Sequence, residues 1–225
     1  MDLEFLQHYS QADQWDMLMF LYESALKEIS TKIEILNAEF MRTHNYNPIE
    51  HITSRIKTSE SIAKKLKKNG FDVTIENMVL NVSDIAGIRV ITSFTPDIYN
   101  VAEMLAKQDD INVILVKDYI KHPKENGYKS YHMVVEVPIF LSGGPVPVRA
   151  EVQIRTIAMD FWASLEHKIY YKFEGHAPSS ISEDLKECAD IVDMLDHRML
   201  QLNEAIMRIK QDGAEGVQEE PDREA

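Results

Sequence analysis

The sequence predicts an α+β protein in which a mixed sheet of about five strands is flanked by helices, including long helices near both ends. Segments with helical and strand-like hydrophobic periods alternate irregularly, rather than as the repeating strand–helix units of a doubly wound parallel sheet. A Ser-Gly-Gly-Pro turn at 142–145 joins two of the strands as an antiparallel hairpin. Neither a Gly-rich dinucleotide fingerprint nor a P-loop motif occurs in the sequence.

Composition narrows the class of protein. A chain of 225 residues can bury a substantial core, and its net charge of −13 argues against a protein that coats nucleic acid. The single Cys188 excludes an internal disulfide, and residues 1–5 lack the pattern of a signal peptide. No apolar run approaches the roughly 20 residues that span a bilayer. We therefore expect a cytoplasmic protein with no membrane association.

The periodicity assigns the individual elements. In the N-terminal helical region, 1–47, apolar residues recur every three or four positions after a cap at Asp13. Pro96 suits the first turn of a helix, and Asn69-Gly70 is a normal helix C-terminus. Phe161, Trp162 and Leu165 are expected to fill the core. The remaining elements expected are an extended segment at 52–56, a helix from 59 to 69, a loop into a buried strand at 84–91, strands at 111–117, 131–138 and 146–155, and a helix at 156–172.

The C-terminal segment, 173–210, is predicted to be one helix with a narrow apolar seam. Its apolar positions alternate steps of three and four, and they are Leu185, Cys188, Val192, Leu195, Met199, Leu202, Ile206 and Ile209. Such a stripe favours a helix–helix partner and hence self-association, although packing on its own domain stays open. The acidic tail, 211–225, is expected to be disordered.

One strand has the pattern of an active-site wall. Strict alternation between 148 and 155 places apolar side chains on one face, while the other face carries Arg149, Glu151, Gln153 and Arg155. Asp84 precedes a second strand, and two carboxylates together with substrate phosphates are a common way to hold Mg²⁺. Asp84 and Glu151 are therefore candidate metal ligands. A solvated outer face for Glu151 and a turn or cap role for Asp84 remain open.

The loop 117–132 carries more functional groups than a connection requires. Gly127 lets the backbone approach a ligand, Tyr128 offers a ring for stacking on a base, and Lys124 and Asn126 offer donors. His132 follows on the next strand, where a buried structural histidine is the alternative. Together these residues favour a nucleotide site.

Positive charge is local on this acidic chain. Residues 42–70 and 117–132 are basic, which indicates a pocket for a polyanionic small molecule. At a strand-to-helix junction, cations and a hydroxyl can form an anion site, and the candidates here are Arg55, Lys57, Ser61 and Lys64. A solvated lysine face on this helix is the alternative.

Three motifs together resemble the synthetase domain of the bacterial alarmone family. They are Asp84-Ile85-Ala86-Gly87-Ile88-Arg89, Pro123-Lys124-Glu125-Asn126-Gly127-Tyr128-Lys129-Ser130-Tyr131-His132 and Glu151-Val152-Gln153-Ile154-Arg155-Thr156. The match covers a catalytic domain at 48–172, and the flanking helices, with no hydrolase or regulatory domain, resemble the small alarmone synthetases. The resemblance implies a nucleotidyltransferase-like fold and transfer of the β,γ-pyrophosphate of ATP to the 3′-hydroxyl of GTP or GDP. The products would be pppGpp or ppGpp, plus AMP.

The resemblance also implies a role for each candidate residue. Mg²⁺ would be the cofactor, held by Asp84 and Glu151. The implied catalytic residues are Glu151, Asp84, Gln153 and His132. The implied ATP ligands are Arg55, Lys57, Ser61, Lys64 and Arg89. The implied GTP or GDP ligands are Tyr128, Lys124, Asn126 and Arg155.

Family members of this size resemble homotetramers built through terminal helices. Some are activated by pppGpp, but those usually carry an aromatic residue and a glycine where this chain has His51 and Ser54, so the resemblance leaves such activation open. Two other functions stay open: a nucleotidyltransferase that releases pyrophosphate, and an RNA-binding regulator. A regulatory RNA contact is compatible with any of them.

Overall fold

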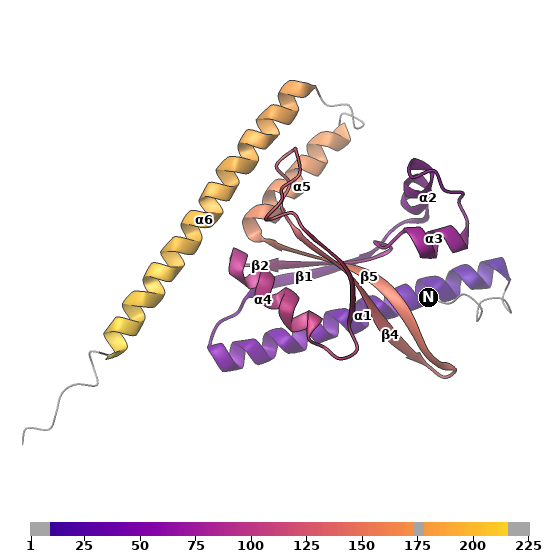
Figure 1. The fold of residues 1–225 in the computed structure, drawn as a ribbon, viewed down its shortest axis with the longest axis horizontal. Helices are drawn as coiled ribbons and strands as arrows, with labels where there is room; N and C mark the ends of the chain where they lie inside the picture. The colour runs from indigo at the N-terminus through magenta and orange to yellow at the C-terminus, as the bar shows by residue number, and fades with distance from the viewer. Residues whose placement is uncertain (1–9, 173–177, 216–225) are drawn as a thin grey trace, which may run out of the picture.

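The computed structural model describes residues 10–172 and 178–215, and its described part is a five-stranded mixed sheet with six helices (Figure 1). The strand order is β1-β2-β5-β4-β3, in which β2 and β5 run parallel and the other neighbouring pairs run antiparallel. The α+β class and the mixed sheet are therefore confirmed. The elements are α1 Gln11–His44, β1 Ile49–Ile56, α2 Ser59–Lys68, α3 Ile75–Asn81, β2 Ala86–Thr92, α4 Thr95–Ala106, β3 Asn112–Asp118, β4 Tyr131–Leu141, β5 Gly144–Thr156, α5 Ile157–Lys172 and α6 Ser179–Glu215.

Helix α1 covers the apolar face of the sheet. Its buried positions follow the helical period, and they are Leu18, Leu21, Tyr22, Ala25, Leu26, Ile29 and Ile33. They pack with the inward side chains of β2, β4 and β5, such as Val90, Val135 and Val152. Each such side chain stabilises the fold by about 2 kcal/mol relative to an exposed one. The opposite face of the sheet is thus left to polar side chains.

Helix α1 is capped at both ends, and its N-cap is not the predicted Asp13. The N-cap is Ser10, whose hydroxyl oxygen accepts the Asp13 backbone N–H at 3.3 Å, so Asp13 lies in the first turn and is not the cap. At the other end Asn45 adopts a left-handed conformation with φ of 51° and stops the helix.

Two further expectations about the core and the elements need correction. Helix α3 was not predicted, because its seven residues bury only Met78 and Val79 and so show no clear period. Trp162 is buried, as expected, but Phe161 and Leu165 are exposed. The reason is that α5 turns a single side, with Trp162, toward α6.

Helix α6 lies beside α5 and extends past it (Figure 1). In the first half of the seam Leu185 is buried against α5 and Val192 packs on the same cluster, although Cys188 is exposed. The exposed residues of the second half are Leu195, Met199, Leu202, Ile206 and Ile209, so the seam divides into a docked half and a bare half. The helix continues to Glu215, beyond the expected boundary at 210, and the rest of the predicted acidic tail lies outside the described residues. No helix in the described part of the chain has an apolar stretch long enough to cross a membrane.

Candidate active site

The polar face of the sheet gathers side chains from its central strands. In β5, Glu151 pairs with Gly87 of β2, and Gln153 lies between Arg89 of β2 and His132 of β4. Because alternate residues of a strand share a face, these positions form one continuous polar surface. Gly87 carries no side chain, so the surface beside Glu151 is left open.

A cavity of about 200 Å³ lies over this surface. Asp84 lines it from the loop before β2, and Arg55 lines it from β1. Arg89, Glu151 and Gln153 also line it. The structure therefore brings together candidate residues from three separate stretches of sequence. Ser54 also lines the cavity, whereas His51 is exposed elsewhere on β1.

Asp84 is held by two lysines. Lys57 Nζ donates to one carboxylate oxygen at 2.9 Å, and Lys65 Nζ donates to the other at 2.8 Å. Burial raises the pKa of Asp84, but the two ammonium groups outweigh it and bring the pKa below its usual value. The carboxyl group is thus an anion in a cationic setting.

Lys65 was not among the candidates drawn from the sequence. It lies one turn after Ser61 on α2, and this spacing places both on one side of the helix. Lys64, which was a candidate, is exposed. The helical position of each lysine decides which one reaches Asp84, and a count of nearby charges in the sequence does not contain that information.

Glu151 is hydrogen-bonded at both oxygens. Its Oε1 lies 3.1 Å from His132 Nδ1, and its Oε2 accepts from Gln153 Nε2 at 2.7 Å. Burial raises the pKa of Glu151, but the hydrogen bonds from His132 and Gln153 together lower it below its usual value. The nearby charge of Asp84 acts to raise the pKa, which reflects the proximity of the two carboxylates.

These contacts belong to a closed ring of five side chains. His132 Nε2 lies 2.8 Å from the hydroxyl of Tyr128, which also accepts from Arg155 at 2.6 Å. Arg155 in turn donates to Gln153 Oε1 at 3.0 Å, and Gln153 closes the ring on Glu151. A neutral His132 with its proton on Nδ1 satisfies every member, a tautomer assigned from these partners. The loop tyrosine and the strand carboxylate are thereby fixed relative to each other.

Asp160, in the first turn of α5, links the two arginines of the site. Its Oδ1 lies 3.3 Å from Arg89 and 3.1 Å from Arg155. Arg155 is buried and spends its donors on Tyr128, Gln153, Ser130 and Asp160, so it holds the site together from behind. Arg89 keeps a buried Nε with no hydrogen-bond partner among the described residues.

The loop between β3 and β4, residues 119–130, presents the aromatic part of the site. Lys124 is exposed overall, but its ammonium group lies 4.5 Å from the ring centroid of Tyr128 and 4.8 Å from that of Tyr119. The rings partly shield this ammonium group from solvent, and the desolvation lowers the pKa of Lys124. Asn126 donates to Glu166 of α5 at 3.1 Å and accepts the backbone N–H of Tyr128. The aromatic ring and its two polar neighbours therefore sit in defined positions.

The donor set is compatible with metal binding, but the ion would need further ligands from a bound substrate. Asp84 and Glu151 offer the hard oxygen ligands that divalent cations such as Mg²⁺ prefer. Within residues 10–172 and 178–215, no group of three or more His, Cys, Asp and Glu side chains is placed to hold a metal ion. A cation bound by these two carboxylates would share its remaining coordination with a ligand such as a phosphate.

Comparison with known proteins adds an independent observation. Residues 54–176 match the family described as the region found in RelA / SpoT proteins. The chain is 45% identical over 194 residues to GTP pyrophosphokinase YwaC of Bacillus subtilis, covering 86% of this chain and 92% of YwaC. It is 35% identical over 190 residues to GTP pyrophosphokinase YjbM of the same organism, covering 84% of this chain and 88% of YjbM.

Solved structures agree with these relatives. The crystal structure of small alarmone synthetase 2 from Bacillus subtilis superposes with a TM-score of 0.77 at 44% identity, covering 85% of this chain and 98% of that one. Small alarmone synthetase 1 from Bacillus subtilis, bound to its product pppGpp, gives a TM-score of 0.80 at 33% identity, covering 87% and 99%. In both comparisons the likeness covers more than four fifths of this chain.

Proposed function

This chain belongs to the RelA/SpoT family, and on this premise we propose that it is a GTP diphosphokinase that makes alarmone. It transfers the β,γ-pyrophosphate of ATP to the 3′-hydroxyl of GTP or GDP and releases AMP. The observation that carries this proposal is the hydrogen-bonded ring that ties Glu151, beside Asp84, to Tyr128. This ring supports the proposal because it links a carboxylate, which the reacting hydroxyl would need, to an aromatic ring, which the guanine base would need. Both substrates are nucleotides of the cytoplasm, where we place the enzyme.

ATP is assigned to the side of the cavity lined by β1, β2 and α2. Arg55 and Arg89, which both line the cavity, flank the adenine. Lys57 and Ser61 bind the phosphates, and Lys65 joins them in place of the exposed Lys64. The two lysines that hold Asp84 are then shared with the phosphates, which leaves carboxylate oxygens for a cation.

Asp84 and Glu151 are the residues that would hold Mg²⁺. When bound there, Mg²⁺ supplies positive charge against the negative charge on the transferring phosphoryl oxygens. This neutralisation, together with alignment of the reacting groups, is most of what pyrophosphoryl transfer requires.

Glu151 accepts the proton of the acceptor 3′-hydroxyl. The 3′-oxygen forms a bond to the β-phosphorus of ATP, and the bond from that phosphorus to the oxygen of AMP breaks. His132 and Gln153 hold the two carboxylate oxygens of Glu151 while each keeps a lone pair for the substrate. The lowered pKa of Glu151 keeps its carboxyl group ionised at neutral pH.

The guanine nucleotide is assigned to the β3–β4 loop. Tyr128 stacks on the base, and Lys124 and Asn126 provide donors beside it. Arg155 acts on this side indirectly, because its guanidinium holds the hydroxyl of Tyr128. Stacking on an aromatic ring is worth about 1 to 3 kcal/mol per base.

Self-association through the terminal helices, as a homotetramer, is supported by the bare half of α6. Five apolar side chains there are about half exposed or more: Leu195, Met199, Leu202, Ile206 and Ile209. An exposed apolar stripe of this length is typical of a surface that another helix covers. Leu202→Glu should lower the mass measured by light scattering, and an unchanged mass would mean that the stripe is not the interface.

The catalytic assignment is tested by Glu151→Gln. We expect the variant to lose alarmone synthesis while it still binds GTP in calorimetric titrations, since the substitution removes the proton acceptor and one proposed Mg²⁺ ligand but not the guanine contacts. Glu136→Gln is the matched control, because Glu136 lies on the neighbouring strand and pairs with Arg149 outside the cavity. Turnover of Glu151→Gln at the rate of the control would refute the assignment.

A further inference from the structure

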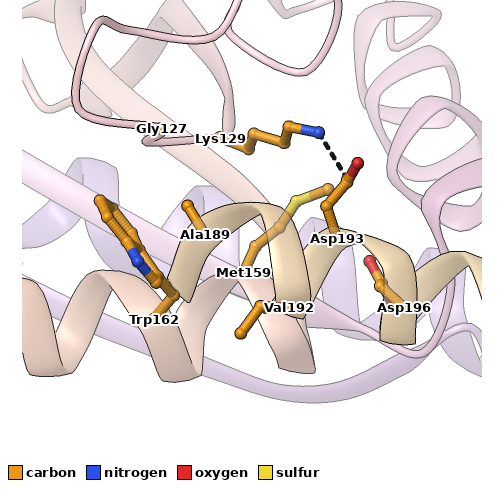
Figure 2. A pocket seen from close by; sticks show the side chains of 8 residues that line it. All are labelled: Gly127, Lys129, Met159, Trp162, Ala189, Val192, Asp193 and Asp196. Atoms are coloured by element: carbon orange, nitrogen blue, oxygen red, sulfur yellow. Dashed lines mark ion pairs between the residues drawn. The ribbon is translucent and has the colours of Figure 1, made fainter. Parts of the chain in front are cut away.

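The β3–β4 loop is packed against α6, as Figure 2 shows for Gly127 and Lys129 above Ala189 and Asp193. The loop carries Tyr128, so the contact lies directly behind the proposed guanine site. A small cavity at this junction is also lined by Trp162 of α5. The first half of α6, which packs on the domain, therefore also contacts the β3–β4 loop.

The first contact is a close approach of backbone to helix. A Cβ atom added to Gly127 would lie 2.5 Å from the Cβ of Ala189, which is too close for any side chain. Gly127 also has φ of +86°, a left-handed conformation that favours glycine. The loop thus reaches its observed position only because both residues are small.

The second contact is electrostatic. Lys129 Nζ forms an ion pair with Asp193 of α6, drawn as the dashed line in Figure 2. Between these two contacts, the ring of Tyr128 packs on the cluster formed by Trp162, Leu185 and Ala189. The residue proposed to stack on guanine is therefore flanked on both sides by tethers to α6.

Helix α6 is itself fixed in register with the catalytic strand. The indole N–H of Trp162 donates to the backbone carbonyl of Leu185 at 2.9 Å. Farther along, the hydroxyl of Thr156 donates to the buried carboxylate of Asp196 at 2.8 Å. Thr156 follows Arg155 at the end of β5, so α6 is anchored next to the residue that holds the hydroxyl of Tyr128.

Within the loop, local bonds do not replace these tethers. The Gly127 and Lys124 backbone N–H groups donate to the carbonyls of Lys124 and Tyr128, which closes a turn inside the loop. A turn of this kind moves as a unit. Its position relative to the sheet depends on the bonds of the Tyr128 hydroxyl to His132 and Arg155, on Asn126, which donates to Glu166, and on the contacts with α6.

We propose that α6 is a positioning element for the guanine nucleotide, in which Asp193 and Ala189 hold the β3–β4 loop so that Tyr128 faces the site. The proposal rests on the proposed function, because it takes Tyr128 as the guanine platform. Neither Asp193 nor Ala189 touches substrate. Both act through the loop, so loosening them weakens guanine nucleotide binding and leaves the ATP side unchanged.

Charge reversal tests the tether. Asp193→Lys places two ammonium groups together and should raise the KM for GTP by about threefold to tenfold, with kcat and the KM for ATP within about twofold of wild type. The double variant Lys129→Asp/Asp193→Lys restores the pair and should return the KM for GTP to near the wild-type value. The control is Asp190→Lys, which makes the same charge change at an exposed position of α6.

Several outcomes would overturn the proposal: an equal KM for GTP in Asp193→Lys and Asp190→Lys, a parallel rise in both KM values, or no rescue in the double variant. If Asp193→Lys does not fold, Asp193→Asn carries the same test, and an unchanged KM for GTP there would also overturn it. Wild-type protein that makes no alarmone would refute the proposed function instead. In that case the Kd for GTP, measured by calorimetry, still reports whether Asp193 acts on guanine binding.

Discussion

The guanidinium of Arg155 donates to the phenol oxygen of Tyr128 at 2.6 Å, which joins a buried strand residue to the tip of the β3–β4 loop. The sequence separates the two by a hairpin, and the fold brings them together because β4 and β5 are antiparallel neighbours. Arg155 is only 5% exposed, so its charge is committed to neighbours and not to solvent. Arg155 therefore holds the ring of Tyr128 in position through its hydroxyl.

Replacing Arg155 by lysine should therefore weaken the guanine side. Lysine keeps the charge beside Asp160 but cannot reach Tyr128 and Gln153 together. Because a hydrogen bond to a charged group is worth about 1.5 to 3 kcal/mol, we expect the KM for GTP to rise by roughly 10- to 100-fold. Steady-state kinetics of Arg149→Lys, on the same strand face, provide the control. Equal KM values for GTP in the two variants would mean that Arg155 does not contribute to guanine nucleotide binding.

Asp160→Asn should affect both substrates. The carboxylate neutralises Arg89 and Arg155 together, and asparagine leaves two neighbouring guanidinium groups without a counter-ion. We expect kcat/KM to fall by about tenfold for ATP and for GTP, given about 1 to 3 kcal/mol for a lost charged partner. Asp190→Asn is the control. A loss confined to one nucleotide would mean that Asp160 serves only one of the two arginines.

Two substitutions at Tyr128 separate its ring from its hydroxyl. Tyr128→Ala removes stacking and should raise the KM for GTP by more than tenfold. Tyr128→Phe keeps the ring but loses the bonds to His132 and Arg155, so we expect a smaller rise than for Tyr128→Ala. Equal KM values for the two variants would argue against stacking on the base.

Lys65 and Lys64 give opposite expectations. Lys65→Ala removes one of the two cations on Asp84 and should raise the KM for ATP by about tenfold. Lys64→Ala removes an exposed side chain of the same type from the same helix, and its KM for ATP should stay within about twofold of wild type. The reverse order would restore Lys64 as the phosphate ligand.

The pKa of Glu151 gives a pH-dependent expectation. Burial raises this pKa, but the hydrogen bonds hold it below the usual value of 4.5. A carboxyl group with a lower pKa in the folded state adds stability above the usual value and loses it as the pH falls through the folded pKa. The difference in unfolding free energy between wild type and Glu151→Gln should therefore shrink below pH 4.5.

Urea denaturation at a series of pH values measures that difference, and Glu34→Gln, at an exposed position of α1, is the control. A difference that grows toward acidic pH would mean that the pKa of Glu151 is raised in the folded protein. In that case burial would raise the pKa of Glu151 by more than the hydrogen bonds from His132 and Gln153 lower it.

Strand alternation was enough to predict the wall of the site, because a period of two fixes which side chains share a face. It could not predict that Arg155 turns away from solvent and serves its neighbours, because this depends on the contacts with Tyr128 and Asp160. Lys65 was missed for a similar reason: Asp84 lies across a different loop, and only the packing of α2 selects one lysine of the row.

The apolar seam of α6 was visible in the sequence, but its division was not. Leu185 meets Trp162 because α5 returns beside α6, whereas Leu202 lies past the end of that contact. Asp193 carried no local signal at all, since its partner Lys129 belongs to a loop distant in sequence. Contacts between distant segments are what composition and periodicity cannot supply.

The most direct test of the central claim is to incubate the protein with Mg²⁺, γ-labelled ATP and GTP, and to separate the nucleotides. Pyrophosphoryl transfer predicts that label appears in a guanosine pentaphosphate, with one AMP formed for each molecule made. Label released as free pyrophosphate, or retained in ATP while GTP binds, would contradict the claim and leave the site with another nucleotide chemistry or with RNA binding.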